Sequence, residues 1–334
     1  MRPFEYASPT TKEQALGLLG TTWGQAEVLA GGTDLLSLMK DDVVHPRRLV
    51  NIKQIKEMSG VSVTPKGLRI GALTTLAELA DNVNVVKDYP ALAEAINDAA
   101  SPQIRNMATI GGNLCQRPRC WYFRGGFGLL PKDESGKDLV AGGENRYHAI
   151  LGNDGPAKFV SPSSIVPVLM AYGAEVRLVG PRGMRVVGLE TFYVLPKNPT
   201  DREHDLRPNE ILAEVILQPS HGMKVAHYEI RQKQAFDWPL AVAAVGLTMN
   251  GQALFGSRVV LGYVAPVPWR SHDGEVALNQ AAHAHGGITE EVVAEAAEAA
   301  LKNATPLSHN AYKVQLAKVA LKRAILKAVA GGAA

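Results

Sequence analysis

Apolar and polar residues alternate along the first 55 residues in a pattern that predicts both helices and strands. Thr10 and Glu13 have the spacing of a capping box, and apolar residues within 15–19 then recur at helical intervals until Gly20. A strand, a helix and a second strand are predicted at residues 27–30, 35–40 and 49–52. This order favours a right-handed parallel crossover.

The middle of the chain changes to antiparallel signals and contains one long segment with little periodicity. Thr75 and Glu78 form a second capping box. The other predicted elements are a hairpin around residues 65–67, a helix over 90–100 that starts at Pro90, a helix over 163–172 and a hairpin around 180–183. Residues 115–160 are rich in glycine, proline and charge, and a loop of that length is usually functional or disordered.

Beyond about residue 220 the pattern predicts apolar strands followed by amphipathic helices. The strands lie at 240–249 and 258–264, and the helices at 289–302 and 311–329. Asn310 is expected to cap the last helix. The apolar face of the helix over 311–329 consists of Val314, Ala317, Leu321, Ala324 and Ala328, so Lys313 is expected on another face.

Composition and charge exclude several classes of protein. Hydrophobic residues make up 46% of the 334 residues and charged residues 20%, which is typical of a globular chain. A net charge of +3 gives no electrostatic footprint for nucleic acid. We find neither an apolar run of about 20 residues nor a secretory signal, and two cysteines make no disulfide framework. A cytoplasmic location is expected, and export in complex with a signal-bearing partner stays open.

Two segments place paired glycines directly after a short apolar stretch. They are Leu29, Ala30, Gly31, Gly32, Thr33, Asp34 and Leu35, and then Ala108, Thr109, Ile110, Gly111, Gly112 and Asn113. Glycine admits positive φ and lets a backbone approach a ligand closely. Because successive amides in such turns can converge on an anion, we expect a diphosphate held by uncharged donors.

One glycine pair alone is usually ordinary turn chemistry, so the argument depends on the two turns together. The chain has no G-x-G-x-x-G after its first strand and no G-x-x-x-x-G-K-[ST]. Both a Rossmann dinucleotide-binding fold and a P-loop are therefore disfavoured.

The two glycine segments, extended to Leu36 and Leu114, resemble the flavin motifs of the FAD-binding medium subunits of molybdenum hydroxylases. This family includes xanthine dehydrogenases, carbon monoxide dehydrogenases and aldehyde oxidoreductases. The likeness covers nearly the whole chain, including residues 119–123, 143–150, 236–237 and 266–270. The long central insertion is most similar to that of the aldehyde oxidoreductase-type subunits.

The resemblance implies an α+β fold, with a two-lobed FAD-binding domain of the vanillyl-alcohol oxidase type (PCMH-like) followed by a small α+β domain. The corresponding boundaries are 1–55 for the first lobe, 56–220 for the second, with the insertion at 115–160, and 221–334 for the C-terminal domain.

The family resemblance also implies which residues contact FAD. Both glycine segments would wrap its diphosphate, and Leu212, on a strand over 211–217, falls where relatives touch the flavin ring. Relatives often carry His-Pro-Ser-Asp where this chain has Ser161, Pro162, Ser163 and Ser164. If Ser164 replaces a flavin-contacting aspartate, it can form a hydrogen bond but adds no negative charge.

Cys115 and Cys120 lie at the start of the insertion. Several relatives bind a [4Fe–4S] cluster through four cysteines there, and Cys120 matches the first of them. Because this chain has only two cysteines, we infer that the cluster has been lost. The favoured interpretation is two free thiols, and the alternative is a shared cluster or a zinc site completed by His148.

Other candidate residues have ordinary alternatives. Residues 121–123, Trp-Tyr-Phe, either anchor the insertion or belong to an interface. His283 and His285 are expected in a surface loop, and Arg105 and Arg117 either steady a phosphate or are solvated.

No catalytic residue or metal-ligand set accompanies the glycine turns, which is typical of a relay. The resemblance implies a large molybdopterin subunit, which oxidises an aldehyde or heterocycle, and a small subunit with two [2Fe–2S] clusters. This chain would take electrons from those clusters and pass them to an external acceptor. The alternatives are a standalone flavin oxidase of similar fold, a scaffold without FAD and a nicotinamide dehydrogenase.

Overall fold

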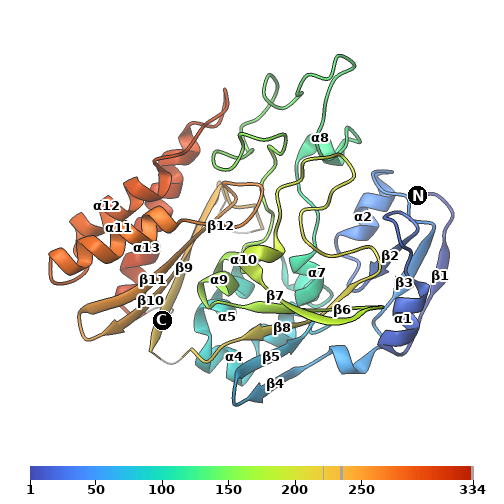
Figure 1. Ribbon diagram of the computed structural model, residues 1–334, viewed down its shortest axis with the longest axis horizontal. Helices are drawn as coiled ribbons and strands as arrows, with labels where there is room; N and C mark the ends of the chain where they lie inside the picture. Colours follow the sequence, from blue (N-terminus) through green and yellow to red (C-terminus); the bar gives the residue numbers. More distant parts are fainter. Residues whose placement is uncertain (221, 234–235, 332–334) are drawn as a thin grey trace.

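The computed structural model describes residues 1–220, 222–233 and 236–331. Three sheets organise this part of the chain (Figure 1). A small parallel sheet lies at the N-terminal side, a five-stranded sheet lies in the centre, and a four-stranded sheet carries the C-terminal helices. The insertion projects from one end of the molecule.

The first sheet has the order β1–β3–β2 and is parallel throughout. Its elements are β1 (Glu5–Ala7), α1 (Lys12–Leu18), β2 (Ala26–Leu29), α2 (Leu35–Lys40) and β3 (Arg48–Asn51). The predicted strand, helix and parallel strand are confirmed, whereas β1 was not foreseen. The first cap was placed one residue early: the hydroxyl of Thr11, not of Thr10, accepts from Gln14 N.

The second sheet has the order β4–β5–β8–β6–β7 and is antiparallel. Its strands are β4 (Val61–Thr64), β5 (Gly67–Gly71), β6 (Glu175–Gly180), β7 (Gly183–Gly188) and β8 (Ile211–Leu217). Both predicted hairpins are confirmed. A register shift between Arg177 and Leu178 leaves Leu212 opposite Leu178.

Short helices fill the space beside this sheet. They are η1 (Lys56–Met58), α3 (Leu76–Ala80), α4 (Val83–Asp88), α5 (Pro90–Asp98), α6 (Pro102–Arg105), α7 (Ile110–Leu114), α9 (Ile165–Ala171) and α10 (Leu189–Phe192). The capping box of Thr75 and Glu78 is confirmed, and Pro90 occupies the first turn of α5. That helix ends at Asp98, two residues before the expected end, because Ala100 has a positive φ of 52°.

The third sheet has the order β12–β11–β10–β9, with three helices packed beside it. The elements are β9 (Met223–Ile230), β10 (Ala241–Asn250), β11 (Ala253–Gly262), β12 (Trp269–Arg270), α11 (His272–Ala284), α12 (Glu290–Leu301) and α13 (Tyr312–Val329). The helix predicted at 289–302 is confirmed, with Thr289 as its cap. β11 begins five residues earlier than expected, and β9, β12 and α11 were not foreseen.

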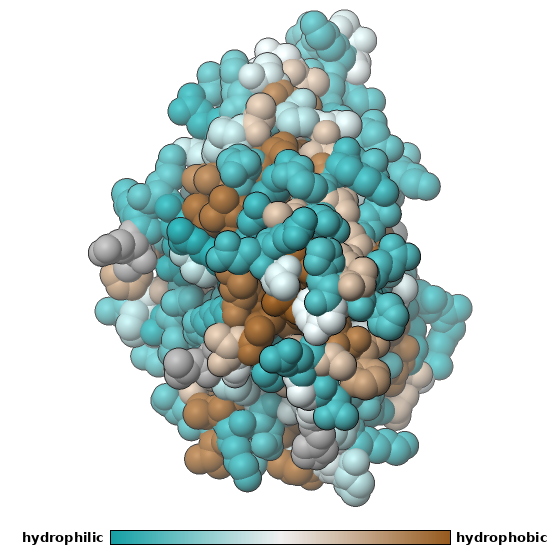
Figure 2. Space-filling model, turned by 90° about the vertical axis from the view of Figure 1, so that its left-hand side faces the viewer, coloured by the Kyte–Doolittle hydropathy of each residue, from teal (hydrophilic) through white to brown (hydrophobic). Residues whose placement is uncertain are grey.

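The strand β10 separates two hydrophobic cores, which explains its unbroken apolar sequence. Ala244 belongs to the core shared with the central sheet, whereas Ala243 and Val245 belong to the core under α11 to α13. From the side of these helices the surface is mostly hydrophilic, with hydrophobic residues in a central strip (Figure 2). Among the described residues, we find no helix long and apolar enough to span a membrane.

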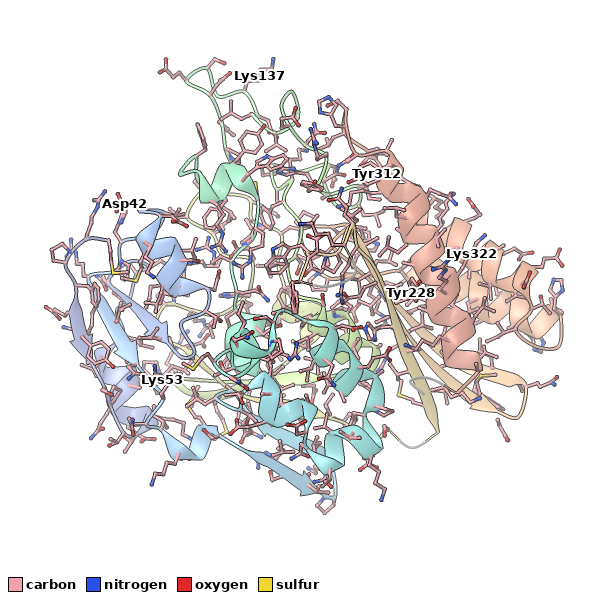
Figure 3. The ribbon with its side chains drawn as sticks, turned by 180° about the vertical axis from the view of Figure 1, so that it is seen from behind. Asp42, Lys53, Lys137, Tyr228, Tyr312 and Lys322 are labelled. Atoms are coloured by element: carbon pink, nitrogen blue, oxygen red, sulfur yellow. The ribbon has the colours of Figure 1, made fainter. Side chains whose placement is uncertain are left out.

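The insertion contains the short helix α8 (Trp121–Arg124) and contacts the start of α13, where the Tyr312 hydroxyl donates to the carbonyl of Arg146. Lys137 lies at its outer tip and Tyr312 below it (Figure 3). Two predictions are wrong here. Asn310 does not cap α13, since its side chain is buried and donates to the carbonyls of His148 and Ala149. Lys313 is 1% exposed, and its Nζ donates to the carbonyls of Tyr147, His148 and Tyr263.

Candidate cofactor site

The two glycine turns, whose glycine pairs are 80 residues apart in the sequence, are in direct contact. The first follows β2, and Gly32 has a φ of +76°, which favours glycine. A Cβ on Gly31 would lie 1.9 Å from the carbonyl oxygen of Met107 and 3.2 Å from the Cα of Ala108. The absence of a side chain at Gly31 is therefore what lets the two backbones meet.

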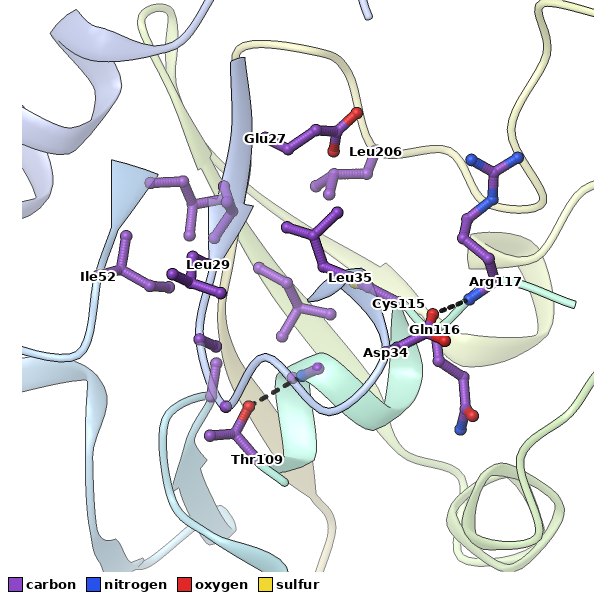
Figure 4. Close-up of a pocket in the computed structure, with 18 of the residues that line it drawn as sticks. Glu27, Leu29, Asp34, Leu35, Ile52, Thr109, Cys115, Gln116, Arg117 and Leu206 are labelled. Carbon is purple, nitrogen blue, oxygen red and sulfur yellow. Dashed lines mark hydrogen bonds between the residues drawn. The ribbon is translucent and has the colours of Figure 1, made fainter. Parts of the chain in front are cut away.

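The second turn is held in shape by its own threonine. Thr109 is the N-cap of α7, and its Oγ1 accepts from Gly112 N at 3.1 Å (Figure 4). Gly111 N donates to the carbonyl of Ala72 at 2.9 Å, which fixes the turn against the central sheet. A Cβ on Gly112 would lie 3.0 Å from Thr109 Oγ1 and would have no other atom within 4 Å, and Gly112 lines the cavity.

Both turns line one cavity of about 1160 Å³, its open mouth included. Of the expected cofactor ligands, the cavity is lined by Leu29, Ala30, Gly31, Gly32, Thr33, Asp34, Leu35, Thr109, Gly111, Gly112 and Leu212. Among the described residues, no group accepts a hydrogen bond from the amides of Gly32 and Thr33. Two free N–H groups at the join of two turns are suitable donors for a diphosphate.

Three of the expected ligands lie outside this cavity. Ala108 is buried, and its carbonyl accepts from Leu76 N. Asn113 lies at a narrow neighbouring pocket, where its Oδ1 accepts from Ser163 Oγ at 2.6 Å. Ser164 is buried with its Oγ 3.5 Å from the hydroxyl of Tyr263.

The remaining walls come from residues that the sequence did not single out as ligands. Trp23 precedes β2 and Glu27 lies within it, and Arg202, His204 and Leu206 come from the segment before β8. Figure 4 shows Glu27 and Leu206 together at the end of the cavity away from Thr109. A glycine motif could have indicated neither group, because their approach depends on tertiary packing.

Ionisable groups are concentrated in the part of the cavity wall formed by β2 and the segment before β8. Burial raises the pKa of the Glu27 carboxyl to about 7, against the opposing effect of the Arg117 charge. Glu27 also pairs with Arg202 at 2.5 Å. The Arg202 guanidinium lies 4.2 Å from the ring centroid of Trp23. Burial and the nearby Arg117 lower the pKa of His204 to about 4, so this imidazole is neutral at physiological pH.

A second charged cluster joins the first glycine turn to the insertion. Asp34 pairs with Arg119 at 2.9 Å and Arg124 at 2.7 Å, and Arg117 pairs with Glu203 at 2.9 Å. Three guanidinium groups against two carboxylates leave one positive charge beside the turn, which favours an anion. Arg117 is thus buried in ion pairs, and Arg105 lies outside the cavity, donating to the carbonyls of residues 97, 99 and 100.

The two cysteines lie in different surroundings. Burial raises the pKa of the Cys115 thiol to about 12, whereas Cys120 Sγ lies 3.2 Å from His148 Nε2. Among the described residues, this pair has no third histidine, cysteine or carboxylate close enough to complete a metal site. Both cysteines are free thiols in this structure.

The structure also shows where the aromatic residues 121–123 and the histidines His283 and His285 lie. Phe123 is buried in a cluster that anchors the insertion, whereas Trp121 is 39% exposed, so an interface role for Trp121 stays a prediction. His283 and His285 are exposed as expected, but His283 lies in the last turn of α11 rather than in a loop.

Comparisons with known proteins agree over the full chain. Residues 2–219 match the family described as the FAD binding domain in molybdopterin dehydrogenase, and residues 226–328 match the CO dehydrogenase flavoprotein C-terminal domain. The aldehyde oxidoreductase FAD-binding subunit PaoB of Escherichia coli is 32% identical over 331 residues, which is 98% of this chain and 99% of that protein.

Carbon monoxide dehydrogenases give the same result in sequence and structure. The medium chain from Hydrogenophaga pseudoflava is 30% identical over 327 residues, 96% of each chain. A solved carbon monoxide dehydrogenase structure from that organism matches with a TM-score of 0.77 and 27% identity, covering 99% of this chain and 100% of the other.

Proposed function

Because this chain belongs to the FAD-binding subunits of the molybdenum hydroxylase family, we propose that it holds FAD in the cavity between its two glycine turns and relays electrons through it. The observation that carries this proposal is the contact between the turns at Gly31 and Met107, beside the free amides of Gly32 and Thr33. Bound FAD supplies the redox chemistry, since it exchanges electrons both singly and in pairs.

In this proposal the chain binds and shields the cofactor. The amides of the first turn donate to the diphosphate, and the excess positive charge of the arginine cluster balances part of its charge. The proposed FAD-contacting residues are Leu29, Ala30, Gly31, Gly32, Thr33, Asp34, Leu35, Ala108, Thr109, Gly111, Gly112, Asn113, Ser164 and Leu212. Ser164 leaves its surroundings without the carboxylate that many relatives carry there.

The division into domains is also a proposal. We assign residues 1–55 and 56–220 to two lobes of a vanillyl-alcohol oxidase-type FAD-binding domain, and residues 221–334 to the C-terminal flavoprotein domain. Support comes from the separate sheets of the two lobes and from the second core beneath α11 to α13.

The partners follow from the same family membership. We propose a large molybdopterin subunit that oxidises an aldehyde or heterocycle, and a small [2Fe–2S] subunit that delivers the electrons to this chain. An external acceptor then receives them. We further propose a cytoplasmic location, on the basis of the two free cysteines.

The visible absorption spectrum tests this function. The full-length chain is purified alone and with its partner subunits, and an aldehyde is added without oxygen. We expect a yellow lone chain whose absorbance bleaches only when the partners are present. Bleaching of the lone chain would support a standalone flavin oxidase, and a colourless complex would support a scaffold.

A further inference from the structure

The side chain of Asp34 is bound by three arginine residues at the start of the insertion. Its Oδ2 accepts from Arg117 N at 2.8 Å (Figure 4), and its Oδ1 accepts from the Arg124 guanidinium at 2.7 Å. Arg119 lies 2.9 Å from the same Oδ1. All three arginines belong to the first ten residues of the insertion, and the carboxyl side chain is only 15% exposed.

The arginines are fixed on their other sides as well. The Arg117 guanidinium pairs with Glu203 and lies 4.8 Å from the ring centroid of Phe123. The Arg124 guanidinium also donates to the carbonyls of Pro118 and Arg117, at 2.9 and 3.1 Å. Residues 117–124 therefore fold around one carboxylate, and charge-assisted bonds of this kind are the stronger hydrogen bonds in proteins.

A carboxylate that accepts from the Arg117 amide and the Arg124 guanidinium, and that pairs with Arg119, is poorly placed to act on a diphosphate. Both groups are anions, and both of its oxygens already have cationic or amide partners. The free amides of Gly32 and Thr33 are the groups suited to the phosphates. The first turn thus has two roles, with its backbone lining the cavity and its one charged side chain bonded to the insertion.

We propose that the Asp34 side chain is a positioning group that anchors the insertion to the first glycine turn, and that its carboxylate is not a ligand of the cofactor. The consequence for FAD rests on the proposed function: the anchored insertion holds the turn in its binding conformation. The far end of the insertion is fixed too, because Asn145 Nδ2 donates to Ser308 Oγ and Lys313 Nζ donates to two carbonyls of the insertion. Ion pairs and hydrogen bonds thereby order a segment that has no four-cysteine cluster to order it.

Hydrogen exchange of the full-length chain tests the anchor, in the FAD-free and the FAD-loaded form. Asp34→Asn is compared with Asp41→Asn, which removes the same charge from an exposed position at the other end of α2. We expect amides of residues 117–126 to exchange about tenfold faster or more in FAD-free Asp34→Asn, because charge-assisted bonds are lost. Exchange in Asp41→Asn should equal that of the wild type.

FAD affinity provides the second readout. Asp34→Asn should raise the Kd for FAD by about tenfold, and Arg124→Met should do the same, with little further effect in the double variant because both remove one anchor. Asp34→Glu keeps the carboxylate and should restore both readouts in part. Arg124→Met also tests the anchor independently if Asp34→Asn folds poorly.

The outcomes are distinguishable. Weaker FAD binding with unchanged exchange of residues 117–126 would make Asp34 a direct ligand and overturn this proposal while leaving the proposed function intact. Faster exchange in a chain that binds no FAD would support the anchor and contradict the proposed function. Additive effects of Asp34→Asn and Arg124→Met would also overturn the anchor.

Discussion

Replacing Gly31 with alanine should force apart the two turns on which the cofactor site depends. The new Cβ would lie 1.9 Å from the carbonyl oxygen of Met107 and 2.8 Å from its carbonyl carbon. Both are backbone atoms, so no side-chain rotation can relieve the contact. Because non-bonded carbon and oxygen stay about 3 Å or more apart, the turns must separate by about 1 Å.

Such a separation has two energetic consequences. Forcing an extra methyl group into a packed contact costs about 1–3 kcal/mol of folding free energy. A hydrogen bond lengthened by about 1 Å lies outside bonding range, and each charge-assisted bond to a diphosphate contributes about 1.5–3 kcal/mol. If the turns hold the diphosphate together, the loss of two such bonds raises the Kd for FAD about 100-fold or more.

Fluorescence quenching of FAD gives the Kd, and circular dichroism of the FAD-free chain shows whether the variant is folded. Gly142→Ala is the matched control, because Gly142 is exposed and has nothing within 4 Å of its added Cβ. If a folded Gly31→Ala protein binds FAD with a Kd within about threefold of the wild-type value, the two turns do not hold the diphosphate together.

Three further predictions follow from single side chains. Gly112→Val should bind FAD at least about tenfold more weakly, since the added side chain would stand in the lining of the cavity; an unchanged Kd in the same fluorescence titration would contradict this. Lys313→Met leaves the carbonyls of Tyr147 and Tyr263 without their donor, while that of His148 keeps Asn310 Nδ2. This variant should lower the free energy of unfolding in urea by about 2–4 kcal/mol, and a loss below about 0.5 kcal/mol would contradict it. Burial and the charge of Lys313 lower the pKa of His148 from 6.5 to about 4, so as pH falls the imidazole is protonated in the unfolded chain before it is protonated in the folded one. The free energy of unfolding should therefore drop between pH 6.5 and 4, by up to about 3 kcal/mol for this group. If His148→Gln leaves this pH dependence of the free energy of unfolding unchanged, the prediction is wrong.

Local signals in the sequence predicted much of the fold because the interactions behind them are local. The capping box of Thr75 and Glu78 closes within one helical turn, and the hairpin of β4 and β5 needs only its own turn. The glycine turns were predicted for the same reason. Their meeting at Gly31 and Met107 was expected only from the family resemblance, since contact between distant segments leaves no local trace.

The errors fall where tertiary contacts override local pattern. Lys313 was expected on a polar face, but carbonyls of the insertion and of Tyr263, 50 residues away, surround its Nζ. Asn310 has the residue type of a helix cap, yet the insertion engages its amide. Arg117 pairs with Glu203 across 86 residues, a contact that neither sequence segment could indicate.

The position of the FAD diphosphate in an experimental structure of the FAD-loaded complex tests the central claim most directly. The account predicts phosphate oxygens about 2.7–3.2 Å from the amide nitrogens of Gly32 and Thr33, at the contact between the two turns. A diphosphate bound elsewhere on this chain, or a freshly isolated complex that contains no flavin, would contradict it.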